Sequence, residues 1–546
     1  MKIRKNSQRE FKGNMTAYAG IIAYIICLVL RIPLCRFIGD EGVGLYAMAF
    51  EIFILIMLLF SHGISRTITG MIRYRVKRAQ YKSARKVFGT AFRFSFIASV
   101  VFAVVVAAAS ELIADTLVLE PMSKKAVLAV SPVIILAALV NVFRGYYNGN
   151  GYGVLGAHSQ YIEKIAIVIF SVICGRFMYD YGLKVSALLK NDMAAYSYGA
   201  LGAVIGMMLA ELITLIYLLV IFIIYSGTWK KQLAQDGARR VESDGEISRL
   251  ILGNAFPTAV IAVICNSFML IDQRFFNYCM NRMELGAQRA GIWGAYYGKF
   301  AALTGIGAAF VCLALYGFIG KIGSAYDKEE YRMMKDRMGS AVKTLCVIAI
   351  PIVVFMTVMA QALVNGLYKG ENELAISLVR CGSVIIFLYG AAYLFGQLML
   401  KVHMGKEFII SLVISFALHI AALFLMERVL LMGAAGILYS TIIFIGLLAV
   451  LCFVFTIKRL KYRQELIYSV LLPALAACIV GLIVMLLNKL LLPVVGNLPT
   501  LLITAVIGFA LYILILIALR VLNEGELSKL PFGNLWIKLG RTVGLM

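Results

Sequence analysis

Ionisable side chains stand inside long apolar segments of this chain, where their charge could bind a polar ligand or carry an ion. Such a charge costs about 2.5–3.5 kcal/mol at the centre of a lipid-spanning helix, so the helix must line a bundle interior or a wet cavity. The first of these residues is Arg31, and Pro33 follows it and removes a backbone hydrogen bond that lipid cannot replace. The chain therefore predicts a polar pathway at its first span.

The candidate substrate-binding residues are ionisable side chains within the predicted spans, namely Arg31, Glu51, Glu211, Asp272 and Lys299. Three of them have an alternative role. Arg31 lies about seven residues, roughly 10 Å, from the outer end of its span and could extend outward to the membrane surface. Glu211 could satisfy a neighbouring cation as a buried pair, and Asp272 could form an interfacial ion pair with Arg274.

Other charged side chains lie nearer the predicted inner face, where we expect Glu163 and Lys164 to be solvated and Arg144 to lie within a turn or two of the cytoplasm. Cations outnumber anions in the spans of the first half and in the seventh and eighth helices. A cavity that gathered several cations would favour an anionic group such as a pyrophosphate, which arginine binds bidentately. A cation exporter would need isolated carboxylates there instead.

Catalytic and cofactor motifs are absent from the sequence. The four histidines are scattered without an HExxH pattern, and no GxxxxGK[ST] phosphate-binding loop occurs. The ten cysteines form no CxxC pair, so neither a metal site nor a disulfide framework is indicated. We expect a protein that is not an enzyme and holds no cofactor. Any transport would be driven by a Na⁺ or H⁺ gradient or by the gradient of the substrate itself.

The composition indicates a multi-pass membrane protein. Of 546 residues, 62% are hydrophobic and 15% are charged, and the mean hydropathy is +0.90. A soluble domain would be near 25% charged. The net charge of +24 could suggest nucleic-acid binding, but the basic residues lie in short loops between apolar spans. Anionic membrane lipids are therefore the expected partner, and nucleic acid is not.

The elements that must position the candidate residues are fourteen predicted transmembrane helices. They fall near residues 15–38, 45–69, 87–109, 126–146, 159–177, 198–225, 250–276, 293–320, 342–366, 374–400, 408–430, 434–457, 467–491 and 501–522. Basic residues are concentrated in alternate loops, which predicts that both termini are cytoplasmic.

The predicted helices group into two lobes that repeat in parallel, because a unit with an even number of spans repeats in the same orientation. The predicted divisions are a cytoplasmic tail (1–13), an N-lobe (14–226), a solvated cytoplasmic linker (227–249), a C-lobe (250–457), two extra helices (458–522) and a cytoplasmic interfacial tail (523–546). Transporters place their substrate between such lobes.

Several motifs resemble the stage V sporulation protein B group of polysaccharide-biosynthesis flippases. They are RIPL at 31–34 with GDEGVGLY at 39–46, GISR at 63–66 with ARKVF at 84–88, and RGYYNG at 144–149 with SQYIE at 159–163. This group is part of the multidrug/oligosaccharidyl-lipid/polysaccharide exporter superfamily, which also holds the lipid II flippase.

The resemblance implies a two-lobe α-helical bundle in a bacterial cell membrane that works by alternating access. It implies an undecaprenyl-pyrophosphate-linked sugar as substrate, a lipid-linked oligosaccharide or a lipid II-like precursor, whose pyrophosphate enters a cationic cavity. By position, Arg31 corresponds to the family's cavity arginine in helix one, and the two extra helices would contact the lipid tail. Glu51 and the stretch at 305–309 depart from the family, which tends to carry proline there.

Two alternatives remain open at this point. A multidrug or organic-cation antiporter of the same superfamily would use Glu211 or Asp272 to bind a proton or sodium ion. A non-transporting scaffold for cell-wall synthases would tolerate the loss of every charge within the spans.

Overall fold

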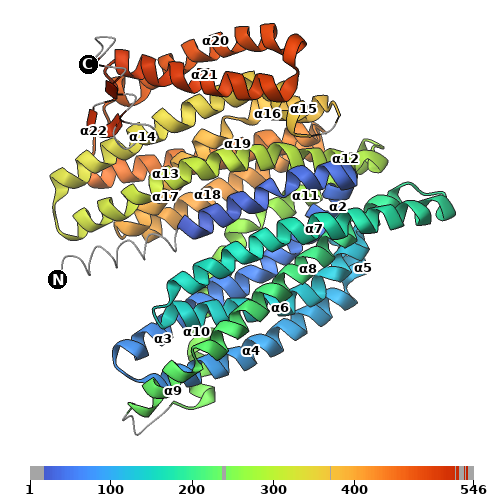
Figure 1. Cartoon of the computed structure of the whole chain (residues 1–546), viewed down its shortest axis with the longest axis vertical. Coiled ribbons are helices and arrows are strands. Elements are labelled where there is room, and N and C mark those ends of the chain that lie inside the picture. Colours follow the sequence, from blue (N-terminus) through green and yellow to red (C-terminus); the bar gives the residue numbers. More distant parts are fainter. Residues whose placement is uncertain are drawn as a thin grey trace. The chain divides into compact units, whose positions relative to one another are not determined.

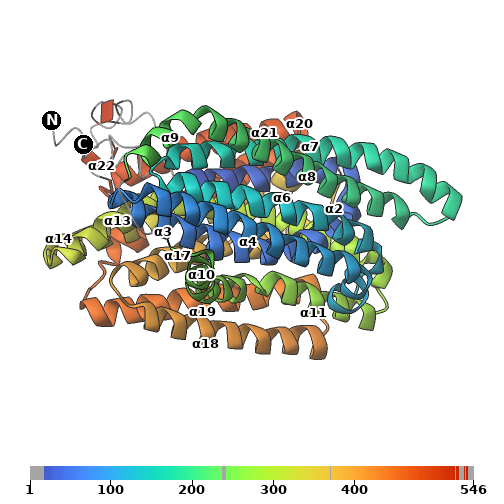
Figure 2. The ribbon, with the colours of Figure 1, turned by 90° about the horizontal axis from the view of Figure 1, so that it is seen from below.

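The computed structural model describes residues 18–236, 242–368, 370–522 and 524–527, with 534, 537, 538 and 541, and without the side chains of Ile261 and Cys265. These residues are almost entirely helical (Figures 1 and 2). The predicted all-α membrane class is thereby confirmed. Most of the predicted interfacial tail at 523–546 lies outside the described residues.

The chain divides into two compact units, unit 1 (Met1–Gly298 and Glu427–Gly433) and unit 2 (Lys299–Met426 and Ala434–Met546). Unit 1 contains α2 (Arg31–Leu58), η1 (Leu59–Ser65), α3 (Arg66–Lys77), α4 (Tyr81–Ala108), α5 (Ser110–Leu112), η2 (Ile113–Val118), η3 (Pro121–Ser123), α6 (Lys124–Gly149), α7 (Gly153–Leu189), α8 (Met193–Ile224), α9 (Ser226–Ala234), α10 (Asp244–Asn266), α11 (Phe268–Arg282), η4 (Gly286–Gln288) and α12 (Arg289–Gly294).

Unit 2 contains α13 (Ala301–Asp327), α14 (Tyr331–Val358), α15 (Ala360–Leu367), α16 (Glu373–Gly382), α17 (Ile385–Lys401), α18 (Gly405–Leu423), α19 (Ala434–Leu460), η7 (Ile467–Leu471), α20 (Leu472–Val495), α21 (Asn497–Ala518) and α22 (Glu524–Leu527). The π-helical turns η5 (Ala295–Phe300) and η6 (Phe424–Val429) contain the points where the chain passes between the units. This division by packing does not test the predicted lobes, which stay a prediction.

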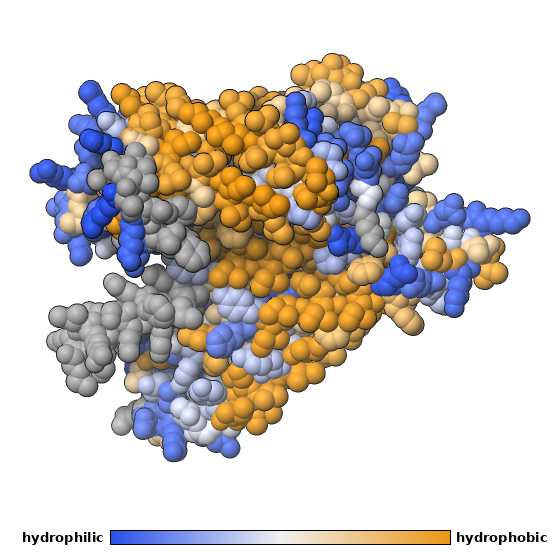
Figure 3. Space-filling model, turned by 45° about the horizontal axis from the view of Figure 1, so that its top comes forward, coloured by the Kyte–Doolittle hydropathy of each residue, from blue (hydrophilic) through white to orange (hydrophobic). Residues whose placement is uncertain are grey.

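The outward face of α4 is apolar, whereas its inward face carries hydroxyl groups. Ile97, Val101 and Val104 are 63%, 56% and 61% exposed, while Ser95 and Ser99 are fully buried. A soluble helix has the reverse pattern, and a helix whose outer face meets lipid has this one. Figure 3 shows hydrophobic side chains over the middle of the helices and hydrophilic ones gathered at their ends.

Eleven helices of the described residues are long and apolar enough to cross a membrane, or twelve if the bent pair α16 and α17 counts as one span. Two further differences explain why this number is below the predicted fourteen spans. The stretch Tyr18–Lys77 holds the first two predicted spans, which Gly39 separates with a non-helical φ of 72°. Helix α7 covers the predicted fifth span and carries Glu163 and Lys164, and it is not among the eleven.

Small residues let α2 and α12 approach each other closely. A Cβ on Gly44 would lie 2.0 Å from the carbonyl oxygen of Ala290, and a Cβ on Gly294 would lie 1.8 Å from that of Asp40. Backbones that come this close exclude any larger side chain. The glycines of the GDEGVGLY motif therefore break the first helix at Gly39 and seat the following helix against α12.

Described residues of the predicted cytoplasmic linker at 227–249 contact helices of unit 1, and the placement of the linker stays a prediction. Asp236 accepts a hydrogen bond from the backbone N–H of Lys82 at 2.6 Å, at the start of α4. Arg75, which is only 6% exposed, pairs with Glu242. The backbone N–H groups at a helix N-terminus and basic side chains attract carboxylates in this way.

The two extra helices of unit 2 form an antiparallel pair, α20 and α21, which lie side by side in Figure 1. They pack on α14 and α15 through a core that includes Ala476, Ala477 and Leu516. The Tyr512 hydroxyl also donates a hydrogen bond to the carbonyl oxygen of Val347 at 3.0 Å. Helices α18 and α19 likewise lie side by side (Figure 2).

We expect Gly294→Ala to destabilise the protein, because its methyl group would overlap the Asp40 carbonyl and cost about 1–3 kcal/mol of overpacking. The measurement is the thermal midpoint of the purified protein in detergent. Gly89→Ala is the matched control, because a Cβ there meets nothing within 4 Å. Equal midpoints for the two variants would contradict the close packing of α2 on α12.

Candidate functional site

Arg31 is held against Tyr297 by two interactions. Its Nη1 donates a hydrogen bond to the Tyr297 carbonyl oxygen at 2.8 Å. Its guanidinium carbon also lies 3.6 Å from the centroid of the Tyr297 ring, within the range of a cation–π contact. The side chain therefore engages protein groups, and the polar pathway stays a prediction.

The close approach of α2 and α12 brings Tyr297 to Arg31. Gly294 ends α12, and Tyr297 lies in the π-helical turn η5 that follows it. Tyr297 is fully buried. One turn later a Cβ on Gly298 would lie 2.6 Å from Cys35 Sγ, so η5 packs on the same helix that carries Arg31. Sequence reasoning missed Tyr297, although the spacing of Gly294 and Gly298 is the small-xxx-small pattern of tightly packed membrane helices.

Two more predicted residues share this region of unit 1. The charge of Arg31 acts on Glu51, and Glu51 in turn is an electrostatic neighbour of Asp272. Glu51 is 6% exposed and Asp272 is fully buried. The next acidic neighbour is Glu427, also fully buried, which sequence reasoning missed although it lies in a predicted apolar span. Arg31 therefore lies in the same region of unit 1 as three buried carboxyl groups, those of Glu51, Asp272 and Glu427.

Asp272 and Arg274 have different surroundings, contrary to the simplest form of the predicted interfacial pair. Arg274 is exposed and donates to the carbonyl oxygens of Thr116 and Leu117, the latter at 3.3 Å. Asp272 instead faces the interior of unit 1. Both contacts of Arg274 belong to the end of η2, so this arginine ties that turn to α11.

Glu211 belongs to a second buried cluster, on α6, α7 and α8. At its centre Glu163 pairs with Arg144 at 2.5 Å and with Lys164. Arg144 also donates to the hydroxyl of Ser159 at 2.8 Å. Glu163 is 4% exposed, so the expectation that it is solvated is wrong: helices α6 and α8 cover the face of α7 on which it lies.

The position of Glu211 supports its alternative role as a partner for buried cations. It is 3% exposed, and Lys164 and Arg144 are its electrostatic neighbours together with Glu163. Its Oε2 has no hydrogen-bond partner among the described residues. The cluster thus combines two cations with two carboxylates, a balance that lowers the cost of burying each of them.

Lys299 is the one predicted site residue that falls in unit 2. It is 4% exposed, and its ammonium nitrogen lies 5.7 Å from the centroid of the Tyr368 ring. A buried ammonium over an aromatic face is a favourable arrangement when water is excluded. Of the five predicted residues, the structure therefore brings Arg31, Glu51 and Asp272 together and places Glu211 in a separate cluster of the same unit.

We expect Glu163→Gln to lower the stability by about 3 kcal/mol, because it leaves the buried Arg144 and the half-buried Lys164 with one carboxylate fewer. Thermal unfolding in detergent measures the change. The control is Arg176→Gln on the same helix, whose 2.9 Å pair with Asp180 is about half exposed and is worth less than about 0.5 kcal/mol. A loss for Glu163→Gln no larger than that of the control would show that the buried cluster contributes nothing to the fold.

Known proteins share this architecture. A stretch of 216 residues is 26% identical to stage V sporulation protein B of Bacillus subtilis (strain 168), and it covers 39% of each chain. The lipid II flippase MurJ in an inward closed conformation matches with a TM-score of 0.66 at 15% identity, over 92% of this chain and 97% of that one.

An inward-facing multidrug resistance transporter of the MATE family, in the MOP superfamily, matches with a TM-score of 0.60 at 14% identity, over 81% of this chain and 94% of the other. At these identities the two structures establish the fold, which is the predicted one. Residues 13–323, more than half of the sequence, match the polysaccharide biosynthesis protein family, and the chain therefore belongs to that family.

Proposed function

We propose that the protein is a flippase that moves an undecaprenyl-pyrophosphate-linked glycan or peptidoglycan precursor from the inner to the outer leaflet of a bacterial cell membrane by alternating access. The family and the fold shared with the lipid II flippase support this proposal. The observation that carries it is Arg31, a cation in the first helix that is positioned by contacts with Tyr297.

The geometry of Arg31 suits a pyrophosphate. A guanidinium has five N–H donors in a planar fork, and the Tyr297 carbonyl accepts from one of its two terminal nitrogens. The Tyr297 ring holds the guanidinium on one side, and we propose that a phosphate binds its remaining N–H donors bidentately. Within a membrane-spanning bundle the effective dielectric is lower than in water, so this attraction is stronger there.

Moving a lipid between leaflets breaks no covalent bond, so the protein needs differential binding in its two states and no catalytic group. Glu51 provides a means of release, because its carboxyl group competes with the substrate for Arg31. Both termini and the basic loops are proposed to be cytoplasmic, which would let the precursor enter from the leaflet where it is made. The coupling ion, Na⁺ or H⁺, would bind one of the buried carboxyl groups.

We expect Arg31→Ala to lower the appearance of precursor in the outer leaflet at least about tenfold, and Arg31→Lys to retain part of the activity, because it keeps the charge and loses the fork. A whole-cell assay of precursor accessibility gives the measurement. Arg36→Ala, at an exposed position of the same helix, should flip normally. Normal flipping by Arg31→Ala, at wild-type protein levels, would remove the assigned role.

A multidrug or organic-cation antiporter is the second candidate, and Glu211 favours it because its Oε2 is buried without a hydrogen-bond partner among the described residues. In that case expression would raise tolerance to cationic dyes, and Glu211→Gln would abolish the tolerance. If the protein is a flippase, expression of neither the wild type nor Glu211→Gln should raise tolerance to cationic dyes. A scaffold that does not transport would keep its cellular role in both Arg31→Ala and Glu211→Gln.

A further inference from the structure

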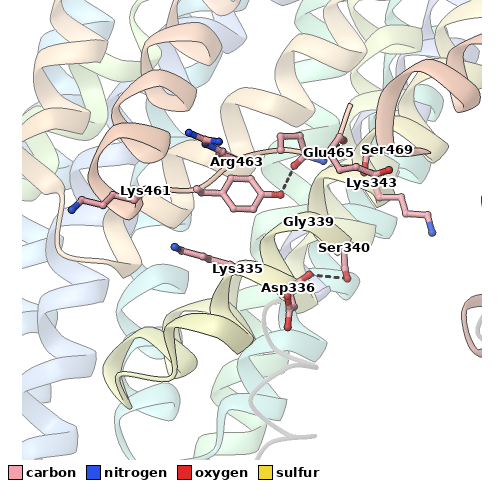
Figure 4. Close-up of a pocket in the computed structure, with 11 residues that line it drawn as sticks. Lys335, Asp336, Gly339, Ser340, Lys343, Lys461, Arg463, Glu465 and Ser469 are labelled. Atoms are coloured by element: carbon pink, nitrogen blue, oxygen red, sulfur yellow. Dashed lines mark hydrogen bonds between the residues drawn. The ribbon is translucent and has the colours of Figure 1, made fainter. Parts of the chain in front are cut away.

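A cationic pocket of about 610 Å³ lies in unit 2, at the start of α14 and beside the connection from α19 to η7 (Figure 4). Its lining includes four cations and two carboxylates: Lys335, Lys343, Lys461, Arg463, Asp336 and Glu465. The nitrogens of Lys335, Lys461 and Arg463 lie on one side in Figure 4, and Lys343 extends on the other. Ser340, Ser469 and Gln464 add hydrogen-bonding groups to the wall.

The fold of the α19–η7 connection keeps the pocket open. Lys461 adopts a left-handed φ of 47°, which ends α19 and turns the chain across α14. The next residue, Tyr462, is buried, and its hydroxyl bonds to Gln464. Burial raises the pKa of Tyr462 to about 12, so its hydroxyl stays protonated and adds no charge to the pocket. Gly339 of α14 makes room for it, because a Cβ there would lie 3.3 Å from the Tyr462 oxygen.

Exposed apolar residues adjoin the cationic lining. Leu466, Ile467 and Leu471, on the chain that leaves the pocket, are 64%, 58% and 60% exposed. Residues of this kind on a membrane protein face acyl chains. The pocket thus joins a charged end, suited to a phosphate, to an apolar face, suited to lipid tails. A soluble phosphate compound would use the first part and leave the second without a ligand.

We propose that this pocket binds the phosphate headgroup of an anionic phospholipid, with its acyl chains along η7 and the start of α20. The excess of cations over carboxylates favours an anion, and basic clusters at the predicted cytoplasmic face attract anionic lipids. This site goes beyond the proposed flippase activity. It concerns a lipid that stays with the protein, and its residues are distinct from those around Arg31.

The test is the binding of phosphatidylglycerol to the full-length protein in detergent, measured by native mass spectrometry against phosphatidylcholine. We expect Lys335→Gln/Arg463→Gln to weaken phosphatidylglycerol binding about tenfold or more, because two cations near the headgroup are lost. The matched control is Lys328→Gln/Arg332→Gln, which removes two exposed cations of the same region that do not line the pocket. This control should bind like the wild type.

A variant that gains affinity guards against misfolding as an explanation. Asp336→Asn/Glu465→Gln removes the carboxylates that oppose the headgroup, so it should bind phosphatidylglycerol more tightly than the wild type. Equal binding by Lys335→Gln/Arg463→Gln and its control would overturn the site. Competition by glycerol phosphate at the same concentration as the lipid would overturn the assignment to a lipid. Both readouts are independent of flipping.

Discussion

The positive charge of Arg31 in the first apolar helix is the constraint on which the structure of unit 1 depends. A charge that faces lipid costs about 2.5–3.5 kcal/mol at the centre of a spanning helix, and less nearer its ends. Tyr297 meets part of this cost, because its carbonyl oxygen accepts a hydrogen bond and its ring lies under the guanidinium. That contact exists because Gly44 and Gly294 allow two backbones to touch. The GDEGVGLY motif, which contains Gly44, therefore also helps to hold the side chain of Arg31 in place.

The other charges within the bundle are also compensated by neighbouring protein groups. Glu163 is neutralised by Arg144 and Lys164 on neighbouring positions of the bundle, and Glu211 joins them. By contrast, Glu51, Asp272 and Glu427 are carboxyl groups that act on one another, and the charge of Arg31 acts on Glu51. The cluster around Glu163 is balanced and suits a structural role, whereas the groups near Arg31 include the one cation that the resemblance assigns to the substrate.

Sequence reasoning reached the fold class because apolar length and charge-poor composition are direct demands of lipid. It also reached Arg31, because a charge in such a segment stands out. It could not reach Tyr297, which is 266 residues away, since an apolar pattern does not say which helices touch. Glu163 was expected in solvent because the sequence places it near the end of a predicted span. The helices that cover it cannot be read from the sequence.

We propose that Arg31 receives the pyrophosphate of a lipid-linked substrate. A cryo-electron-microscopy structure of the protein with undecaprenyl pyrophosphate bound tests it most directly. We expect phosphate density within hydrogen-bonding distance of the Arg31 guanidinium, with the Tyr297 ring still beneath it. Density for the pyrophosphate elsewhere, with Arg31 contacting protein groups alone, would contradict it.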